Sequence, residues 1–404
     1  MDIVVAHNNY KQPGGEDACV SSEVAMLRAF GHNVTQYSLH NDATDAMGRV
    51  QLASRTVWNR ASYRELRRLF KDHRPHIAHF HNTFPLMSPS AYYAARAENV
   101  CVVQTLHNFR LFCVNGLLFR QGEVCETCLG KAIAWPGIAR KCYRNNLAAS
   151  AVTATMVAVH RALGTWRNAV DMYIALSESS RRKLVQGGIS VDKIAVKPNF
   201  VYPDPGPGVG KGGYAIYVGR LSVEKGIETL LSAWRQLSDV PLKIVGDGPL
   251  ATAVQEAAAH NPAIEWLRCV QRESVDELIG DAACLVLPSQ CYENFPRVLI
   301  EAFAKGTPVI VSRLGAMAEI VRDGCTGLHF KPGDPDELVS KIRFILADPR
   351  GLQCMRDAAR RTFDQDFTAA ANHRLLMAVY EQALVRRSRA GPAGHSIAPV
   401  SIRS

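Results

Sequence analysis

Short apolar runs alternate with longer, helix-like patterns along almost the whole chain of 404 residues. This alternation is typical of βαβ units and of parallel sheets with helices on both faces. Six runs in the first half predict strands at residues 2–7, 32–38, 76–81, 101–106, 172–177 and 194–198. Six more follow at residues 214–219, 242–246, 263–267, 283–289, 307–312 and 327–331, and an amphipathic helix is expected around residues 334–346.

The alternation breaks at residues 199–213, where Pro and Gly crowd together in NFVYPDPGPGVGKGG. We interpret this stretch as an interdomain linker. The predicted fold is therefore α/β with two Rossmann-like, doubly wound domains at residues 1–200 and 201–370. A helix at 371–385 is expected next, with a return to the first domain as one option, and the basic stretch 386–404 is expected to be a disordered tail.

Composition narrows the class of protein without naming a partner. A hydrophobic share of 47% and a charged share of 21% are ordinary for a folded globular protein. The net charge of +10 favours polyanions: nucleic acid, an anionic lipid surface or phosphorylated small molecules. The chain opens on a strand-like run, which predicts a cytoplasmic protein. The apolar run at residues 147–160 is too short for a membrane span and predicts a buried helix.

Charged residues follow two predicted strands of the second half. Ligands of open α/β sheets bind beyond the carboxyl ends of the strands, where helix N-termini expose free N–H groups. Arg220 and Lys225 follow the strand YAIYVG, and such a pair of cations suits a diphosphate. A solvated surface is the alternative for both cations.

The segment CYENFPRVLIEAFAKGTPVIVS, residues 291–312, places a carboxylate on each side of a predicted helix start. Pro296 suits the first helical turn, and the amides of residues 297–299 are expected to lack intrahelical acceptors, so they could hold a phosphate oxygen. Glu301 lies one turn further, within reach of a ribose hydroxyl, and Glu293 in the loop could accept from sugar hydroxyls. The alternative is that both glutamates only complement the helix dipole.

These segments resemble the donor domain of glycosyltransferase family 4, the retaining nucleotide-sugar enzymes of GT-B fold, in which two domains face a central cleft. The Glu-x7-Glu spacing of Glu293 and Glu301 is typical of that family. The resemblance implies that Arg220 and Lys225 bind the donor diphosphate, Glu301 the ribose and Glu293 the transferred sugar. The expected donor-binding set is completed by Asn294, Phe295, Arg297 and Val298. Asn294 and Pro296 depart from the sequence Glu-Gly-Phe-Gly found in many members of the family. The identity of the transferred sugar therefore stays open.

The first half also carries candidate ligand-binding residues. Gly14 and Gly15 follow the first strand and let the backbone approach a ligand; in the resembling family this pair lies against the donor phosphate or the acceptor. His107 matches the family's cleft histidine, which hydrogen-bonds the transferred sugar. His79 and His81 share one strand face, where packing is favoured over a metal site.

Four cysteines in the segment 108–145 form a spacing of C-x11-C-x2-C-x13-C: Cys113, Cys125, Cys128 and Cys142. Such a set suits a structural zinc ion that staples a long insertion. Reduced core thiols and an iron–sulfur cluster are the alternatives.

The function that the resemblance implies is retaining transfer of a sugar from a nucleoside-diphosphate sugar to an acceptor hydroxyl, in polysaccharide or glycolipid synthesis. The resemblance implies catalysis by Glu293, His107, Arg220 and Lys225 without a catalytic metal, through front-face attack, with a covalent intermediate as the alternative. The acceptor would be a saccharide or a lipid-linked saccharide, which suggests peripheral contact with the inner face of the plasma membrane. An epimerase of the same fold and a non-catalytic nucleotide-sugar-binding protein remain alternatives.

Two further classes are disfavoured. The run GDGPLA, residues 246–251, fits a dinucleotide-binding pattern, but Asp247 would bring a negative charge towards a pyrophosphate. Aromatic residues total 8% and lie mostly in apolar runs, so a nucleic-acid partner is not expected.

Overall fold

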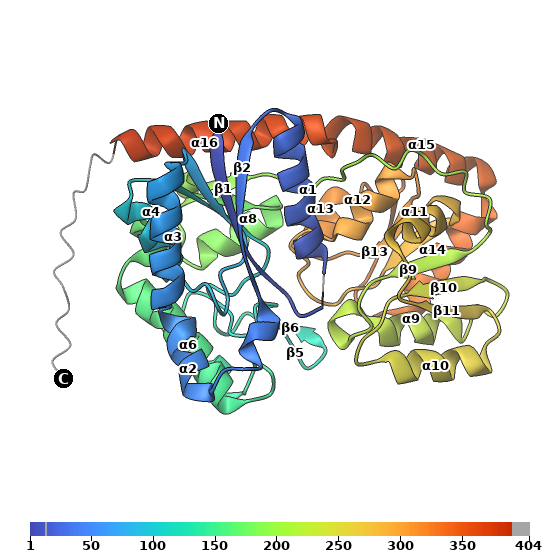
Figure 1. The fold of residues 1–404 in the computed structure, drawn as a ribbon. Helices are drawn as coiled ribbons and strands as arrows, with labels where there is room; N and C mark the ends of the chain where they lie inside the picture. The colour runs from blue at the N-terminus through green and yellow to red at the C-terminus, as the bar shows by residue number, and fades with distance from the viewer. Residues whose placement is uncertain (13, 390–404) are drawn as a thin grey trace.

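The computed structural model describes residues 1–12 and 14–389. They form two α/β domains that lie side by side, each built on a six-stranded sheet (Figure 1). All strand pairs within both sheets are parallel, and helices cover the sheet faces. The prediction of two doubly wound, Rossmann-like domains is therefore confirmed.

The first sheet has the strand order β2-β1-β3-β4-β7-β8. Its strands are β1 (Asp2–Asn9), β2 (Asn33–His40), β3 (Ile77–Phe80), β4 (Cys101–Leu106), β7 (Met172–Ala175) and β8 (Ile194–Val196). The helices are α1 (Gly15–Ala29), α2 (Arg49–Val57), α3 (Arg60–His73), α4 (Ser90–Ala97), α5 (Trp135–Ala139), α6 (Leu147–Ala162), α7 (Thr165–Asn168) and α8 (Glu178–Gln186). The insertion after β4 carries a small antiparallel hairpin of β5 (Phe119–Arg120) and β6 (Glu123–Val124).

The second sheet has the order β11-β10-β9-β12-β13-β14. Its strands are β9 (Ala215–Val218), β10 (Leu242–Val245), β11 (Ile264–Arg268), β12 (Cys284–Leu287), β13 (Val309–Ser312) and β14 (Gly327–Phe330). The helices are α9 (Ile227–Trp234), α10 (Ala251–His260), α11 (Arg272–Asp281), α12 (Arg297–Ala304), α13 (Gly315–Ile320), α14 (Pro335–Ala347) and α15 (Pro349–Asp366), followed by α16 (Ala369–Arg389).

Central strands of both sheets are apolar along their whole length because helices cover both faces. Every residue of β3, β7, β12 and β13 is buried. Strands buried in this way lack the in–out alternation of half-exposed sheets. The continuous runs in the sequence are a direct consequence of this layering.

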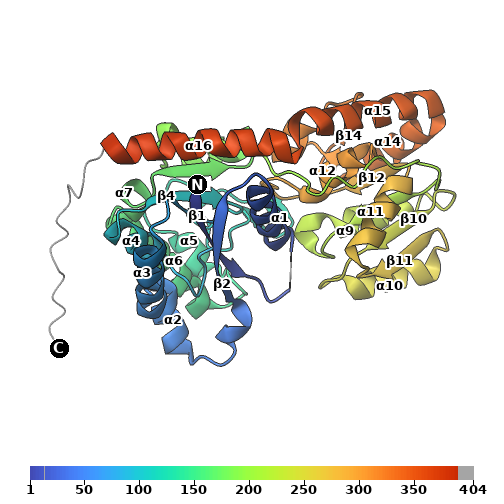
Figure 2. The ribbon, with the colours of Figure 1, turned by 45° about the horizontal axis from the view of Figure 1, so that its top comes forward.

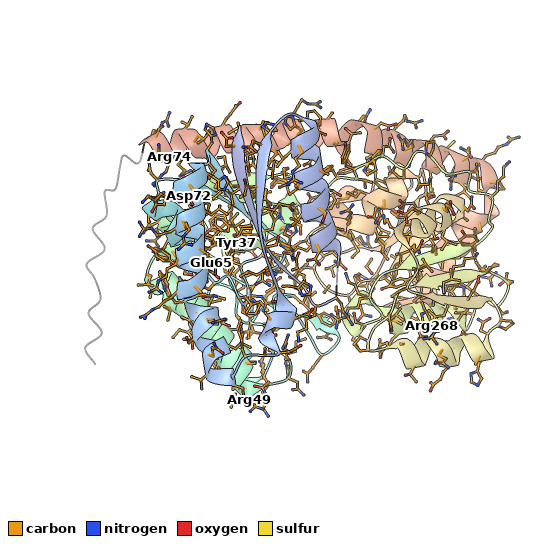
Figure 3. All side chains as sticks on the ribbon, in the orientation of Figure 1. Tyr37, Arg49, Glu65, Asp72, Arg74 and Arg268 are labelled. Carbon is orange, nitrogen blue, oxygen red and sulfur yellow. The ribbon has the colours of Figure 1, made fainter. Side chains whose placement is uncertain are left out.

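Helix α3 shows how a polar helix is fixed on the first sheet. The side chain of Asn59 caps its N-terminus by accepting from the amides of Ala61 and Ser62. Leu66 and Phe70 of this helix are buried on the side that faces the protein interior. Tyr37 of β2 donates to Glu65 of α3 at 2.6 Å, and the two side chains lie together in Figure 3.

The last helix, α16, runs from the second domain back along the first (Figure 2). Leu376, Val379 and Tyr380 are buried against the first sheet, and Asn372 donates to the carbonyl of Pro198 at 2.7 Å. The helix continues to Arg389, so the expectation of disorder from residue 386 is wrong for residues 386–389. Residues 390–404 of the expected tail lie outside the described residues.

The apolar run that begins at Leu147 forms α6, which buries one face and leaves Leu147 52% exposed. The prediction of a buried helix is thus correct only for that one face. Within residues 1–12 and 14–389, no helix combines the length and the apolar character needed to cross a bilayer.

Candidate functional site

Each sheet has one topological switch point, where successive strands are added on opposite sides of the first strand. Strand β1 lies between β2 and β3, and β9 lies between β10 and β12. The loops after β1 and β3, and those after β9 and β12, therefore diverge and leave room for a ligand. Several predicted site residues lie in these connections or at the start of the helix that follows: Gly14, Gly15, Arg220, Lys225 and Glu293.

The structure brings Lys225 and Glu293 together. Oε1 of Glu293 accepts from Nζ of Lys225 at 2.6 Å and from Oγ of Ser289 at 2.7 Å. Burial opposes the charge of Lys225, but the Glu293 carboxylate holds the pKa of Lys225 above its usual value. The two residues follow neighbouring strands, β9 and β12, and form one charged centre.

Gly226 allows the two loops to meet. Its φ is +73°, and a Cβ placed on it would lie 1.9 Å from the carbonyl oxygen of Pro288. Only glycine tolerates both this conformation and this approach. Lys225 is thereby held next to the loop that carries Glu293.

Arg220 contributes a second cation to the loop after β9. Its backbone carbonyl accepts from the hydroxyl of Tyr217 at 2.8 Å, while the residue itself is exposed. The backbone is therefore held in place and the guanidinium is accessible to a ligand.

Glu301 is more strongly engaged than the sequence suggested. It is 4% exposed, and its Oε1 lies 2.6 Å from Nη1 of Arg272 and 2.8 Å from Nε of Arg297. Both contacts fall on the same oxygen. A carboxylate has about four lone-pair sites, so Oε2 retains capacity for a ligand hydroxyl.

The N-terminus of α12 faces the glycine turn of the first domain. A Cβ on Gly15 would lie 4.0 Å from Cβ of Arg297, and Arg297 donates to Oγ of Ser22 at 3.1 Å. The expectation of three free amides is wrong for Leu299, whose N–H donates to the carbonyl of Pro296 at 3.1 Å. A tight first turn closes that hydrogen bond, which leaves Arg297 and Val298 as the amides for an anion.

Asn294 and Phe295 connect the domains through their side chains or backbone. Oδ1 of Asn294 accepts from Ser180 at 2.8 Å, and the carbonyl of Phe295 accepts from Asn199 at 3.3 Å. The ring of Phe295 is buried against Phe367. Only the backbone of Phe295 is therefore available to a ligand.

Glu319 makes a further contact between the domains. Its two carboxylate oxygens accept from the amides of Glu178 and Ser179, at 2.8 and 2.7 Å, in the first turn of α8. Charge-assisted bonds to a helix N-terminus are strong. An open cavity of about 580 Å³ lies beside this contact and is lined by both domains, including Ser177, Pro198, Phe295 and Glu319.

His107 lies at the end of β4 and is partly exposed. Its Nε2 is 3.0 Å from Nδ1 of His81, and Nε2 of His81 is 3.2 Å from Oε1 of Glu23 on α1. Burial lowers the pKa of His81 to about 4 and holds that of His107 well below its usual value. Both imidazoles are therefore neutral at neutral pH.

His79, His81 and Glu23 place their ligand atoms within 4.8 Å of one another, the arrangement that a metal would need. However, Nζ of Lys197 lies 3.0 Å from Oε2 of Glu23, and Lys197 is 2% exposed. The buried ammonium already balances the carboxylate and would repel a second cation. That His79 and His81 serve packing rather than metal binding stays a prediction.

The first loop contains another acidic centre. Oε2 of Glu16 accepts from the hydroxyl of Tyr10 at 2.8 Å, and Asp17 lies 2.9 Å from His7. Burial raises the pKa of the Glu16 carboxyl to about 7. The Glu16 carboxyl therefore titrates near neutral pH.

Two family models match the chain. The model for Glycosyltransferase Family 4 matches residues 13–204, and that for glycosyl transferases group 1 matches residues 206–362. The chain belongs to glycosyltransferase family 4. The dinucleotide-binding interpretation of residues 246–251 is thereby overturned. Gly246 instead lets its loop pack on the carbonyl oxygen of Gly219, which would lie 2.0 Å from an added Cβ.

Similar proteins include the sulfoquinovosyl transferase SQD2 of Arabidopsis thaliana, 29% identical over 42% of this chain and 33% of that protein. A glycogen synthase of Mycobacterium tuberculosis is 35% identical over 38% of each chain. This chain thus spans well under half the length of these curated relatives. The crystal structure of Anabaena HepE in complex with UDP matches 94% of this chain and 99% of its own, with 16% identity and a TM-score of 0.69. The GT-B fold is therefore confirmed.

The four cysteines of the insertion line one small cavity of about 10 Å³ together with Gly137 and Arg140. All four are free thiols. Among the described residues, however, no three of their sulfur atoms lie within 4.8 Å of one another. The structure brings the cysteines into one place but does not arrange them as a formed tetrahedral site.

Several residues at the site were not identified from the sequence: Ser180, Arg272, Ser289 and Glu319, together with Glu23 and Lys197. The last two did carry a signal. Glu23 falls on the apolar face that Val20, Val24 and Leu27 define on α1, and Lys197 follows the apolar strand β8. A charge at such a position is buried and needs a partner.

Proposed function

We propose that this protein is a retaining glycosyltransferase that transfers a sugar from a nucleoside-diphosphate donor to an acceptor hydroxyl. The observation that supports it best is the convergence of Lys225, Glu293 and the N-terminus of α12 opposite Gly15. Cations and free amides suit a diphosphate, and carboxylates suit the hydroxyls of the sugars attached to it.

In this proposal, the departing diphosphate is stabilised by Arg220, Lys225 and the amides of Arg297 and Val298. Fixed donors aimed at developing charge lower the barrier by several kcal/mol, so these groups would take the place of a catalytic metal. Glu293 orients the transferred sugar and the free oxygen of Glu301 accepts from the ribose. In a front-face reaction, the leaving phosphate oxygen takes the proton of the acceptor hydroxyl.

The named relatives support a role in polysaccharide or glycolipid synthesis, since one is a glycogen synthase and another a sulfoquinovosyl transferase. The HepE structure holds UDP, which supports a nucleotide sugar as donor. The acceptor would then be a saccharide or a lipid-linked saccharide.

A panel of nucleotide sugars would test the function through thermal shift, donor hydrolysis and transfer to sugar acceptors. We expect one donor to stabilise the protein and to turn over, with the anomeric configuration retained in the product by proton NMR. Arg220→Ala should lower kcat/KM at least tenfold because its cation faces the leaving group. Binding without turnover would favour the non-catalytic alternative, and conversion of the donor sugar into its epimer would favour an epimerase.

Peripheral contact with an anionic membrane is proposed for the exposed basic side of α3. Its cationic residues are Arg60, Arg64, Arg67, Arg68, Lys71 and, just after its end, Arg74. Arg74 lies at the outer end of this helix in Figure 3. Each such cation contributes about 1 kcal/mol near an anionic surface.

Sedimentation with vesicles tests this contact. The protein should bind phosphatidylglycerol vesicles at low salt, and the triple variant Arg64→Gln, Arg68→Gln, Lys71→Gln should bind several-fold less. Equal binding to phosphatidylcholine vesicles, or no loss in the variant, would contradict the proposal.

A structural zinc ion is proposed for Cys113, Cys125, Cys128 and Cys142. The cavity that they line is large enough for one water-sized body, and a zinc ion bound there would hold the sulfurs at about 2.3 Å. Glu126, between two of these cysteines, is 2.7 Å from Nζ of Lys183 on α8. That ammonium in turn lies 4.9 Å from the ring of Tyr292, the neighbour of Glu293.

Metal analysis of protein purified without chelators should find about one zinc per chain, lost in the Cys125→Ser/Cys128→Ser variant. The double variant of the isolated thiols Cys269→Ser/Cys354→Ser, both exposed, is the matched control. Zinc retained after loss of Cys125 and Cys128, or no zinc in the unaltered protein, would refute the assignment.

A further inference from the structure

A hydrogen-bonded chain of three side chains leads from the interior of the first domain to His107. Glu23 is 3% exposed and His81 is 4% exposed, and both belong to the interior. The distances along the chain, 3.2 Å from Glu23 to His81 and 3.0 Å from His81 to His107, are those of hydrogen bonds. The other ring nitrogen of His107, Nδ1, has no hydrogen-bond partner among residues 1–12 and 14–389.

The protons on this chain follow from its charged end. Burial opposes ionisation of Glu23, but Lys197, with His79 and His81, holds the pKa of its carboxyl well below the usual range. Glu23 is therefore a carboxylate, which accepts hydrogen bonds and does not donate them. Nε2 of His81 must carry the proton in that bond.

A neutral imidazole carries one proton, so Nδ1 of His81 is bare and accepts from its neighbour. That neighbour is Nε2 of His107, which must then carry the only proton of its own neutral ring. The remaining nitrogen of His107 is a lone-pair acceptor. Each tautomer is determined by the one before it, starting at Glu23.

We propose that Glu23 acts as a positioning residue that sets the tautomers of His81 and His107 in series, so that His107 presents an unprotonated Nδ1 and accepts a hydrogen bond from a hydroxyl of the transferred sugar. This inference rests on the proposed function for the identity of the group that His107 meets. The assignment of the tautomers themselves does not.

The inference has a consequence for specificity. An acceptor nitrogen binds a hydroxyl that donates to it and repels a phosphate or carboxylate oxygen. A sugar that lacks the hydroxyl at that position leaves the nitrogen unpaired, which is a costly mismatch in a closed site. His107 then recognises a sugar hydroxyl by accepting its hydrogen bond, and it does not donate a proton to the leaving group.

The cluster around Glu23 is built to hold this charge in the interior. Lys197 donates to Oε2 of Glu23 and to Oδ1 of Asn372, each at 3.0 Å. His79 lies 3.0 Å from Oε1 of Glu23 and 2.8 Å from the hydroxyl of Tyr380. A buried charge persists only when paired and hydrogen-bonded in this way, and His7, 6.3 Å from His81 between ring centres, completes the surroundings.

The first test is nitrogen-15 NMR on protein labelled at its 13 histidines, because pyrrole-type and pyridine-type nitrogens have different chemical shifts. Signals of His81 and His107 are assigned by their loss in His81→Gln and His107→Gln. Both rings should be protonated at Nε2. A His107 protonated at Nδ1 would overturn the proposal, whether or not the protein transfers sugar.

The second test changes the start of the chain. Glu23→Gln with Lys197→Met keeps the interior neutral, and the amide can donate or accept, so His81 and His107 should populate both tautomers. Asp171→Asn is the matched control: Asp171 is a 4% exposed carboxylate of the same domain, paired with Arg96 at 3.0 Å, and it makes no hydrogen bond to Glu23, His81 or His107.

With the donor that the panel identifies, the Glu23/Lys197 variant should lose at least tenfold in kcat/KM relative to Asp171→Asn, and the two should differ in the histidine spectrum. An equal loss in both variants, or a mixed tautomer with unchanged kcat/KM, would overturn the role of Glu23. If no donor turns over, the proposed function fails and the sugar-binding half of this proposal fails with it, while the spectrum still decides the tautomers.

Discussion

Replacing Lys225 by Met tests the charged centre of the proposed donor site. The substitution removes the ammonium that lies 2.6 Å from Oε1 of Glu293 and keeps most of the side-chain volume. Glu293 then retains Ser289 as its hydrogen-bond donor, and its negative charge faces the proposed diphosphate without compensation. Both protein stability and catalysis should suffer.

The size of the effect follows from the geometry. Two unit charges 4 Å apart interact by about 4 kcal/mol at an effective dielectric constant of 20. Lys225 is 31% exposed and Glu293 12% exposed, so solvent screening reduces this to about 2 kcal/mol. The same loss applied to the transition state lowers kcat/KM about 30-fold, since about 1.4 kcal/mol corresponds to a factor of ten.

Urea denaturation and donor turnover measure the two effects separately. The variant should lose about 2 kcal/mol of unfolding free energy, and Lys225→Met with Glu293→Gln should regain most of the stability without regaining activity. Lys341→Met is the control, because Lys341 is equally exposed and pairs with Glu337 on α14. A Lys225→Met protein with kcat/KM within threefold of the unaltered chain would refute the assignment of Lys225 to the leaving group.

Three further substitutions give defined outcomes. Gly226→Ala should lower the free energy of unfolding, measured by urea denaturation, by at least 3 kcal/mol. Gly324→Ala is the control, because Gly324 has the same φ of +73° but nothing within 4 Å of an added Cβ, and it should lower that free energy by about 1 kcal/mol. Equal losses would exclude the contact with Pro288. Glu16→Gln should stabilise the protein by about 2 kcal/mol at pH 7.5 and not at pH 4. The pKa of Glu16 is about 7 in the folded protein and 4.5 when unperturbed, so the stability of the unaltered protein falls as the pH rises between these two values. A pH-independent effect of the substitution would contradict a raised pKa of this carboxyl. Glu319→Gln weakens two charge-assisted hydrogen bonds between the second domain and α8 of the first. The two domains should then lie further apart, so small-angle scattering of the ligand-free protein should give a larger radius of gyration. An unchanged radius would contradict a role of Glu319 in holding the domains together.

The sequence predicted the layering and the location of the site for physical reasons. Strands covered on both faces must be apolar throughout, so β7 and β12 appear as continuous runs. Residues near the carboxyl ends of parallel strands gather at one edge, so Lys225 and Glu293 could be grouped before any contact was known.

Contacts between distant segments could not be predicted in the same way. Arg272 lies on α11 and reaches Glu301 on α12, and nothing in either local pattern links the two residues. Phe295 was expected to face the ligand, but its ring completes a core with Phe367. Pairing across elements depends on three-dimensional packing, which periodicity does not encode.

Helix α16 makes the first domain discontinuous in sequence. Tyr380, fully buried, and Asn372 complete the interior beneath β1, β3 and β8, although both lie beyond the second domain in the chain. An expression fragment that stops at the linker would therefore expose an apolar groove and leave Lys197 without one of its partners. Separate study of the first domain calls for a fusion that reattaches residues 369–389, or a circular permutant.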